Sequence, residues 1–209
     1  MALDFVVSAF VTLLVVVDPV SLAPVFASLT RGLPPAARRQ IALTACLIAA
    51  GILCGFALVG DWLLGQLEIT LPAFRIAGGL LLFAVAFDMV LGWRGEREGK
   101  AAVEAVHEEH IRRIAAFPLA IPLMAGPGAI TATLLLAGRA HERALYIAML
   151  LGVIVAVCAI CFAVYLAAGR LSRFLGTTVN LVFSRLLGVI LAALAVQYVL
   201  DGIRAVLAP

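Results

Sequence analysis

Long runs of apolar residues, separated by short polar segments, dominate this chain. Six of these runs are long enough to cross a bilayer, which takes about 20 residues in a helix. We expect membrane-spanning helices over residues 4–30, 40–60, 70–92, 114–137, 144–168 and 180–203. The pattern therefore predicts an all-α membrane protein with six transmembrane helices, which form a single transmembrane domain over residues 1–209.

Prolines interrupt the first and the fourth of these runs, within residues 17–24 and 118–131. Proline lacks an N–H and clashes with the preceding turn, so each helix should break there. Lipid cannot pair the freed backbone groups, and such breaks persist only where they are buried in protein or line a cavity. Matching breaks in two halves of a chain are typical of the binding site of a secondary transporter.

The two halves of the chain also resemble each other weakly in sequence. Asp18-Pro19 aligns with Gly126-Pro127 at a shift of 108 residues, and Arg75 aligns with Arg185 at a shift of 110. Three helices per half is an odd number, so the second half enters from the opposite side of the membrane. We therefore predict an inverted 3+3 repeat with broken helices 1 and 4. Its parts are repeat one (1–92), a polar linker (93–113) and repeat two (114–209).

Composition narrows the class of function. Hydrophobic residues make up 65% of the chain and charged residues 13%, whereas a soluble domain carries roughly 25% charged residues. No nucleotide-binding motif is present, and His107 and His110 in the linker depart from the H-E-x-x-H spacing. No histidine falls in a membrane segment. We therefore expect no cofactor, no metal, no nucleic-acid partner and no enzymatic activity.

Basic residues predict the orientation in the bilayer. Loops between helices 1–2, 3–4 and 5–6 share one side, and they carry more Lys and Arg than the loops on the other side. The first side holds Arg31, Arg38, Arg39, Arg94, Arg97, Lys100, Arg112, Arg113, Arg170 and Arg173, and the second holds Arg139, Arg143 and Arg204. Positive residues favour the cytoplasm, so both termini should face out.

The half-helices that begin at the two breaks have N-termini inside the protein. Free N–H groups and the positive end of the helix dipole suit a carboxylate there, at Val20-Ser21 and at Gly128-Ala129. An ammonium group would meet Asp18, or carbonyl oxygens near Ala125 and Gly126. The predicted substrate-binding residues are Asp18, Pro19, Val20, Ser21, Ala125, Gly126, Pro127, Gly128, Ala129 and Thr131.

Asp18 is the one ionisable residue expected deep inside a membrane segment. Such residues are functional candidates, and this one would bind an ammonium group or carry a coupling proton. Asp followed by Pro is also a good N-cap and first helical residue, so Asp18 would equally serve to cap the second half-helix. Both roles remain open. Asp88, near the end of its helix, is expected at the membrane interface.

Two segments resemble the MarC/SnatA family of bacterial inner-membrane proteins. The first is D-P-x-[GS]-x-x-P, at Asp18 to Pro24. The second, more specific, is P-L-A-x-P-x-x-A-G-P-G-A-I, at Pro118 to Ile130. Many members have Gly-Asn where this chain has Ser21-Leu22. The resemblance implies a proton-coupled carrier for small neutral amino acids such as glycine and alanine.

Taken together, the sequence predicts secondary transport of a small zwitterionic amino acid, coupled to protons or sodium, by alternating access across a lipid bilayer. One alternative is a carrier or channel for another small solute that uses the same broken helices. A second alternative is a scaffold or regulatory membrane protein without transport activity, whose prolines only kink helices. A cavity at the breaks would favour transport over this last possibility.

Overall fold

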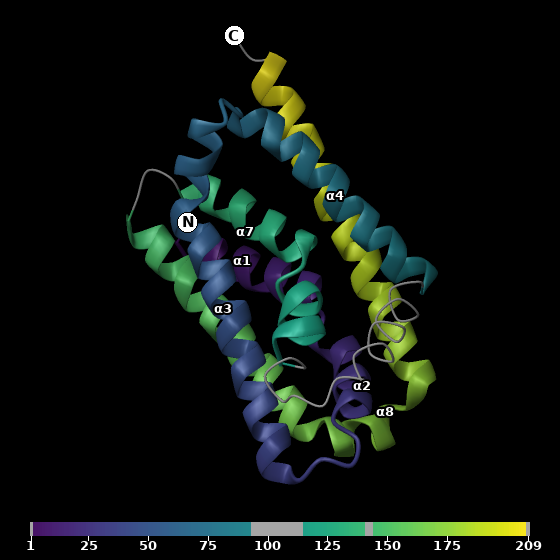
Figure 1. The fold of residues 1–209 in the computed structure, drawn as a ribbon. Coiled ribbons are helices and arrows are strands. Elements are labelled where there is room, and N and C mark those ends of the chain that lie inside the picture. Colours follow the sequence, from purple (N-terminus) through teal and green to yellow (C-terminus); the bar gives the residue numbers. More distant parts are fainter. Residues whose placement is uncertain (1, 93–114, 141–143, 208–209) are drawn as a thin grey trace.

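The structure, a computed structural model, describes residues 2–92, 115–140 and 144–207, and the predicted linker lies outside them. All regular secondary structure in these ranges is helical (Figure 1). The elements are α1 (Ala2–Val17), α2 (Pro19–Leu29), α3 (Pro35–Gln66), α4 (Leu71–Leu91), the π-helix η1 (Ala115–Met124), α7 (Pro127–Ala140) and α8 (Ala144–Leu207).

Five helical segments of the described chain are long and apolar enough to span a membrane, where the sequence predicted six. They are Ala2–Leu29, Pro35–Gly60, Leu71–Leu91, Ala144–Ala168 and Leu181–Leu207. The predicted fourth span is divided between η1 and α7, of 10 and 14 residues. Neither reaches the roughly 20 residues that a span requires. The all-helical membrane fold is confirmed. The count of six spanning helices is not, and the fourth predicted span forms two short helices on either side of its predicted break.

The last two spans belong to one assigned helix, α8. Figure 1 shows that α8 changes direction between them, so that its first arm (144–168) and second arm (181–207) run separately through the molecule. We call these the N-terminal arm and the C-terminal arm. Large apolar side chains such as Leu58, Leu80 and Leu186 are exposed on the outside of the bundle. A surface so rich in exposed apolar groups suits contact with lipid.

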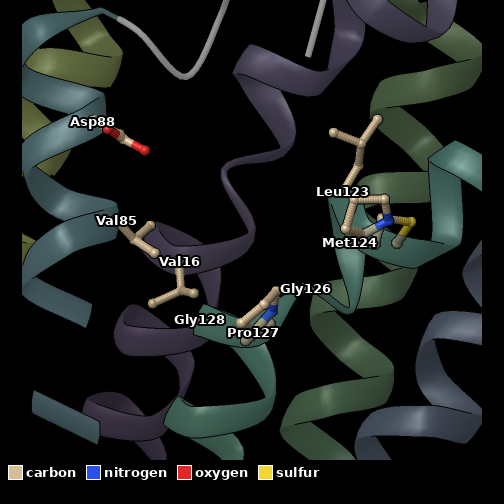
Figure 2. Close-up of a pocket in the computed structure, with 10 residues that line it drawn as sticks. Val16, Val85, Asp88, Leu123, Met124, Gly126, Pro127 and Gly128 are labelled. Atoms are coloured by element: carbon tan, nitrogen blue, oxygen red, sulfur yellow. The ribbon is translucent and has the colours of Figure 1, made fainter. Parts of the chain in front are cut away.

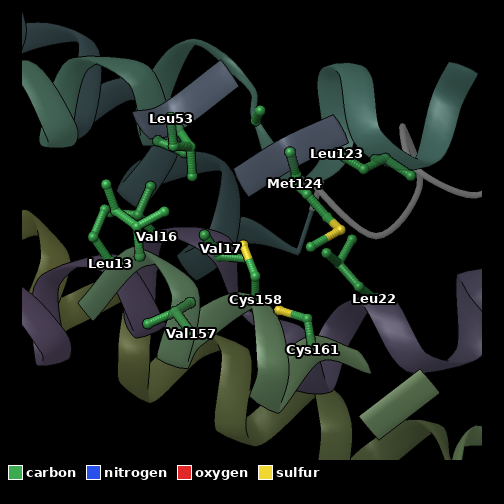
Figure 3. Close-up of a cluster of buried hydrophobic side chains, with 14 of the residues drawn as sticks. Leu13, Val16, Val17, Leu22, Leu53, Leu123, Met124, Val157, Cys158 and Cys161 are labelled. Carbon is green, nitrogen blue, oxygen red and sulfur yellow. The ribbon is translucent and has the colours of Figure 1, made fainter. Parts of the chain in front are cut away.

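The core forms where the two broken segments meet. Val17 and Leu22, on either side of the first break, lie in one buried cluster with Met124 of η1 and with Cys158 and Cys161 of the N-terminal arm (Figure 3). These cysteines are free thiols and pack as small hydrophobic groups. Both breaks are therefore held inside protein rather than against lipid.

Two adjacent glycines on α4 allow two other helices to pack closely against it. A Cβ on Gly78 would lie 2.7 Å from Cγ2 of Thr131 on α7. A Cβ on Gly79 would lie 2.8 Å from the carbonyl oxygen of Ala195 and 2.7 Å from Cγ2 of Val199, both on the C-terminal arm. Successive helical positions point about 100° apart, so the two glycines serve two different neighbours.

The contact between α4 and the C-terminal arm is antiparallel and reciprocal. A Cβ on Gly188 would lie 3.1 Å from the carbonyl oxygen of Ala86 and 3.0 Å from Cγ2 of Val90. These are the same atoms of the same residue types that surround Gly79. The matching residues are separated by a constant offset of 109 positions: Gly79 and Gly188, Ala86 and Ala195, Val90 and Val199.

Replacing Gly79 by Ala should destabilise the bundle, because its Cβ would press on the carbonyl of Ala195, a backbone atom that cannot rotate away. Gly51→Ala is the matched control, since a Cβ there would have no atom of another described segment within 4 Å. The control should be neutral or gain about 0.5–1 kcal/mol from helix propensity. Thermal unfolding in detergent should give a lower Tm for Gly79→Ala only. Equal Tm values would contradict the close packing.

Candidate functional site

Asp18 forms the first break. Its backbone is left-handed (φ 50°, ψ 65°), a conformation that Asp and Asn adopt more readily than other non-glycine residues. Pro19 occupies the first position of α2, where no N–H is needed. The Ser21 N–H donates to Oδ1 of Asp18 at 3.3 Å, so the carboxylate caps α2, which is one of the two roles that the sequence left open.

Asp18 also connects the break to the C-terminal arm. The Ser184 hydroxyl donates to Oδ2 of Asp18 at 3.2 Å, and Asp18 is only 1% exposed. A buried carboxylate requires such partners, because removing it from water is costly. Beside it the Ser21 hydroxyl oxygen is buried too, and it has no hydrogen-bond partner among the described residues. The first break is thus a buried polar site in an apolar core.

The second break lies between η1 and α7. The Ala125 N–H donates to the carbonyl of Ala120 at 2.8 Å, which closes the last wide turn of η1. The Ile130 N–H donates to the carbonyl of Gly126 at 3.0 Å and begins α7. A Cβ on Gly126 would collide with the carbonyl oxygen of Pro122. Close approach of the chain to itself therefore requires glycine at 126.

A cavity of about 150 Å³ opens at this second break (Figure 2). It lies between the end of α1, the last turns of α4 and the start of α7. Most of its wall is apolar, and one side chain that lines it carries a charge. The lining residues are Val16, Val85, Asp88, Pro122, Leu123, Met124, Gly126, Pro127, Gly128 and Ala129.

The structure divides the predicted site residues between two neighbouring places. Four of them line the cavity: Gly126, Pro127, Gly128 and Ala129. Four others lie at the first break, outside the cavity lining: Asp18, Pro19, Val20 and Ser21. Ala125 is buried at the second break, and Thr131 faces Gly78 of α4. The breaks share one core cluster, but the cavity at the second break does not include residues of the first.

Sequence reasoning missed the contribution of α4. Asp88, expected at the interface, lines the cavity together with Val85, and in Figure 2 its carboxylate points into the open space. Gly78 faces α7, and Val85 and Asp88 follow it by seven and ten residues. That spacing places all three on one helical face. The spacing in the sequence indicates that these residues share one face of α4, but it does not indicate which helix packs against that face.

The far end of α7 is tied to the C-terminal arm. The Arg139 guanidinium lies 3.5 Å from the Asp201 carboxylate and 4.6 Å from the ring centre of Tyr198. Gln197 donates its side-chain N–H to Asp201 at 2.8 Å. α7 runs antiparallel to α4, from Gly128 beside Val85 at one end to Gly138 beside Leu71 at the other. This cluster and the cavity thus lie at opposite ends of α7.

No group of three or more His, Cys, Asp or Glu side chains within the described ranges is arranged to hold a metal ion. The polar atoms at the first break are a carboxylate and two hydroxyls, from Asp18, Ser21 and Ser184. Oxygen ligands of this kind are those that hard cations prefer. The chemistry available is therefore ion and small-ligand binding by carboxylates, hydroxyls and helix termini.

Comparison with known proteins gives matches along nearly the whole chain. The family model described as MarC family integral membrane protein matches residues 3–207. The UPF0056 membrane protein MJ1677 of Methanocaldococcus jannaschii is 35% identical, over 99% of this chain and all of its own length. A UPF0056 membrane protein of Aquifex aeolicus is 40% identical over 95% of this chain and 92% of its own. YhcE of Escherichia coli is 37% identical over 94% and 91%. No solved structure gives a significant match.

Asp18→Ala should destabilise the protein by about 1–3 kcal/mol, because alanine neither caps α2 nor tolerates the left-handed backbone. Asp18→Asn should cost much less, since Asn keeps the acceptor for the Ser21 N–H and adopts the same backbone conformation. Thermal unfolding of both variants in detergent measures the difference. An equal and large loss in both would show that the charge, rather than the cap, holds the break.

Proposed function

The chain belongs to the MarC family of integral membrane proteins, and from this premise we propose that it is a secondary transporter of small neutral amino acids such as glycine and alanine. The observation that carries the proposal is the second break, where a helix interrupted inside a membrane bundle borders a cavity. Breaks of this kind are tolerated where they face protein or line a cavity, and transporters use them to bind substrates.

We propose that the architecture is the inverted 3+3 repeat. Its support is the reciprocal contact of α4 with the C-terminal arm at a constant offset of 109 residues. In a reciprocal contact, residue i of one element touches residue j of the other, and the counterparts of these two residues touch each other in the same way. Such a contact implies that a twofold axis relates the two elements. Because these helices are antiparallel, that axis lies across them, in the plane of the membrane. In this arrangement α1 and α2 correspond to η1 and α7.

The cavity suits a small zwitterion. A buried space of about 150 Å³ accommodates benzene, which has six heavy atoms, and the cavity here has that volume. Glycine has five heavy atoms and alanine six. The first N–H groups of α7 have no partner within that helix, and the positive end of its dipole favours an anion. We propose that the N–H groups of Gly128 and Ala129 bind the substrate carboxylate.

The buried polar site at the first break suits the coupling ion. Asp18, Ser21 and Ser184 place carboxylate and hydroxyl oxygens together, and the Ser21 hydroxyl is without a partner among the described residues. Leaving a buried hydroxyl unpaired costs about 1–3 kcal/mol. A proton on Asp18, or a sodium ion among the oxygens, would change these contacts when substrate binds nearby. We propose that Asp18 carries the coupling.

The proposed setting is the bacterial inner membrane, with both termini on the periplasmic side. The excess of Lys and Arg in the loops between helices 1–2, 3–4 and 5–6 supports this orientation. The cavity at a helix break favours transport over a scaffold or regulatory role, and we propose a carrier rather than an enzyme. The partners are then the amino acid, protons or sodium, and the lipid bilayer, without a cofactor or nucleic acid.

Proteoliposomes test the proposal directly. Labelled glycine and alanine should accumulate saturably under an inward proton or sodium gradient, whereas leucine, with nine heavy atoms, should not. Asp18→Asn should retain binding and lose gradient-driven accumulation if Asp18 carries the coupling. Normal accumulation by this variant would show that Asp18 serves only as the cap of α2. Linear flux without saturation would favour a channel, and no uptake by folded protein would refute amino acid transport.

Gly128→Val should weaken glycine binding at least tenfold, because the new side chain occupies the cavity. A Cβ at this position would lie 3.2 Å from Cγ2 of Val85 and 3.4 Å from Cγ1 of Val16, so little room remains for a ligand. Gly51→Val is the matched control, since beyond its own stretch of helix none of the described residues lies within 4 Å of a Cβ there. Calorimetric titration of both purified variants measures the affinity. Unchanged affinity in Gly128→Val would place the ligand elsewhere.

A further inference from the structure

The two helix breaks pack at different levels along the pair formed by α4 and the C-terminal arm. At the second break, a Cβ on Gly128 would lie 3.2 Å from Cγ2 of Val85 on α4. At the first break, the Ser184 hydroxyl of the arm donates to Oδ2 of Asp18. The offset of 109 makes Leu194 the counterpart of Val85, and Leu194 lies ten residues beyond Ser184. At 1.5 Å per residue, the breaks differ by about 15 Å in their position along equivalent helices.

Helix α2 runs from Ser184 toward the bend of α8 and away from Leu194. Phe26, further along α2, stacks on Tyr165 near the end of the N-terminal arm, with ring centres 4.7 Å apart. Figure 1 likewise shows α2 beside the bend between the two arms. The first break therefore packs against the beginning of the C-terminal arm and not against its middle.

The reciprocal contact between α4 and the C-terminal arm gives a reference for these levels. Gly79 packs against the arm seven to eleven residues after Gly188, and Gly188 packs against α4 seven to eleven residues after Gly79. The centre of the contact therefore lies about four to five residues after each glycine. Along the helices, Val85 lies within about 2 Å of this centre and Ser184 about 13 Å from it. The second break lies at the centre of the pair, and the first does not.

Burial along the two helices follows the same twofold relation. Leu82 and its counterpart Leu191 are fully buried, and so are Ala86 and its counterpart Ala195. The pair is thus symmetric in contact and in burial, whereas the broken segments that pack on it are not. Equivalent segments on a symmetric frame can exchange their arrangements, because each then takes the place that the other occupies now.

The hydrogen bonds at the first break are compatible with such a movement. The bond from the Ser21 N–H to Asp18 lies within the cap of α2, so it would move with that helix. The bond from the Ser184 hydroxyl would break, and it joins two side chains rather than two backbones. Helix α2 would therefore stay intact as it moves.

We infer, on the basis of the proposed inverted repeat and carrier function, that the protein has a second state with the arrangements of the two breaks exchanged. In that state the first break lies at the centre of the pair, beside Leu194. The second break lies toward the opposite end, beside Arg75, the counterpart of Ser184. Residues 18–20 then line the cavity, in the place that residues 126–128 have here. Because the repeats are inverted, the two states open toward opposite sides of the membrane.

Cysteine cross-linking in proteoliposomes tests for the second state. Val85→Cys with Gly128→Cys reports the present state, because a Cβ at 128 would lie 3.8 Å from Cβ of Val85, which suits a disulfide. The counterpart pair, Val20→Cys with Leu194→Cys, reports the second state. Both pairs are made in a background in which Ala replaces the native free cysteines, Cys46, Cys54, Cys158 and Cys161.

Mild oxidation should form both disulfides, one in each state. Each disulfide should abolish glycine uptake, because it prevents the exchange, and a reductant should restore the uptake. Val20→Cys with Ala205→Cys is the matched control and should not form a disulfide. Ala205 is exposed and lies eleven residues beyond Leu194 on the same face of the helix, but neither state brings it to the first break.

A disulfide between positions 20 and 194 that forms no faster than the Ala205 control would overturn the inference, and glycine uptake by that protein would leave the proposed function standing. Failure of the 85–128 disulfide would contradict the contact on which the inference depends. Both disulfides without uptake of glycine or alanine by the reduced protein would uphold the second state and refute the proposed substrate. Melting temperatures before oxidation show that each variant is folded. If Leu194→Cys is unfolded, Gln197→Cys, an exposed position on the next turn, replaces it.

Discussion

Every backbone polar group within a membrane needs a partner, and the rest of this structure depends on how the two helix breaks meet that requirement. At the first break the Asp18 side chain supplies the acceptor for an N–H of α2. At the second break a wide turn of η1 pairs Ala125 with Ala120, and α7 then starts at Pro127. Both breaks are enclosed by α1, η1 and α8 in one cluster, because lipid offers no hydrogen bonds.

Small residues decide how closely the helices enclose these breaks. Gly78 admits α7 to one side of α4, and Gly79 and Gly188 admit the C-terminal arm to another. In lipid there is little hydrophobic force between helices, so close packing of this kind provides much of the association. With α7 held along α4, its N-terminus lies opposite Val85 and Asp88, and the cavity is the space that remains between them.

The two ends of α7 have different surroundings. At its N-terminus the cavity borders Asp88, whereas at its C-terminus Arg139 pairs with Asp201 and lies against Tyr198. Exposed ion pairs contribute about 0–1 kcal/mol, so the Arg139–Asp201 pair holds α7 to the C-terminal arm only weakly.

The sequence by itself determined the membrane class, the helical content and the positions of both breaks, because these depend on local composition and on proline. It also indicated Asp18 as the cap of α2, which Asp-Pro specifies locally. Only the tertiary structure decided that the cavity opens at the second break and that Asp88 lines it, because both depend on which helix packs against α4. The π-helical form of η1, before the second break, was likewise decided by the way its backbone pairs within the bundle.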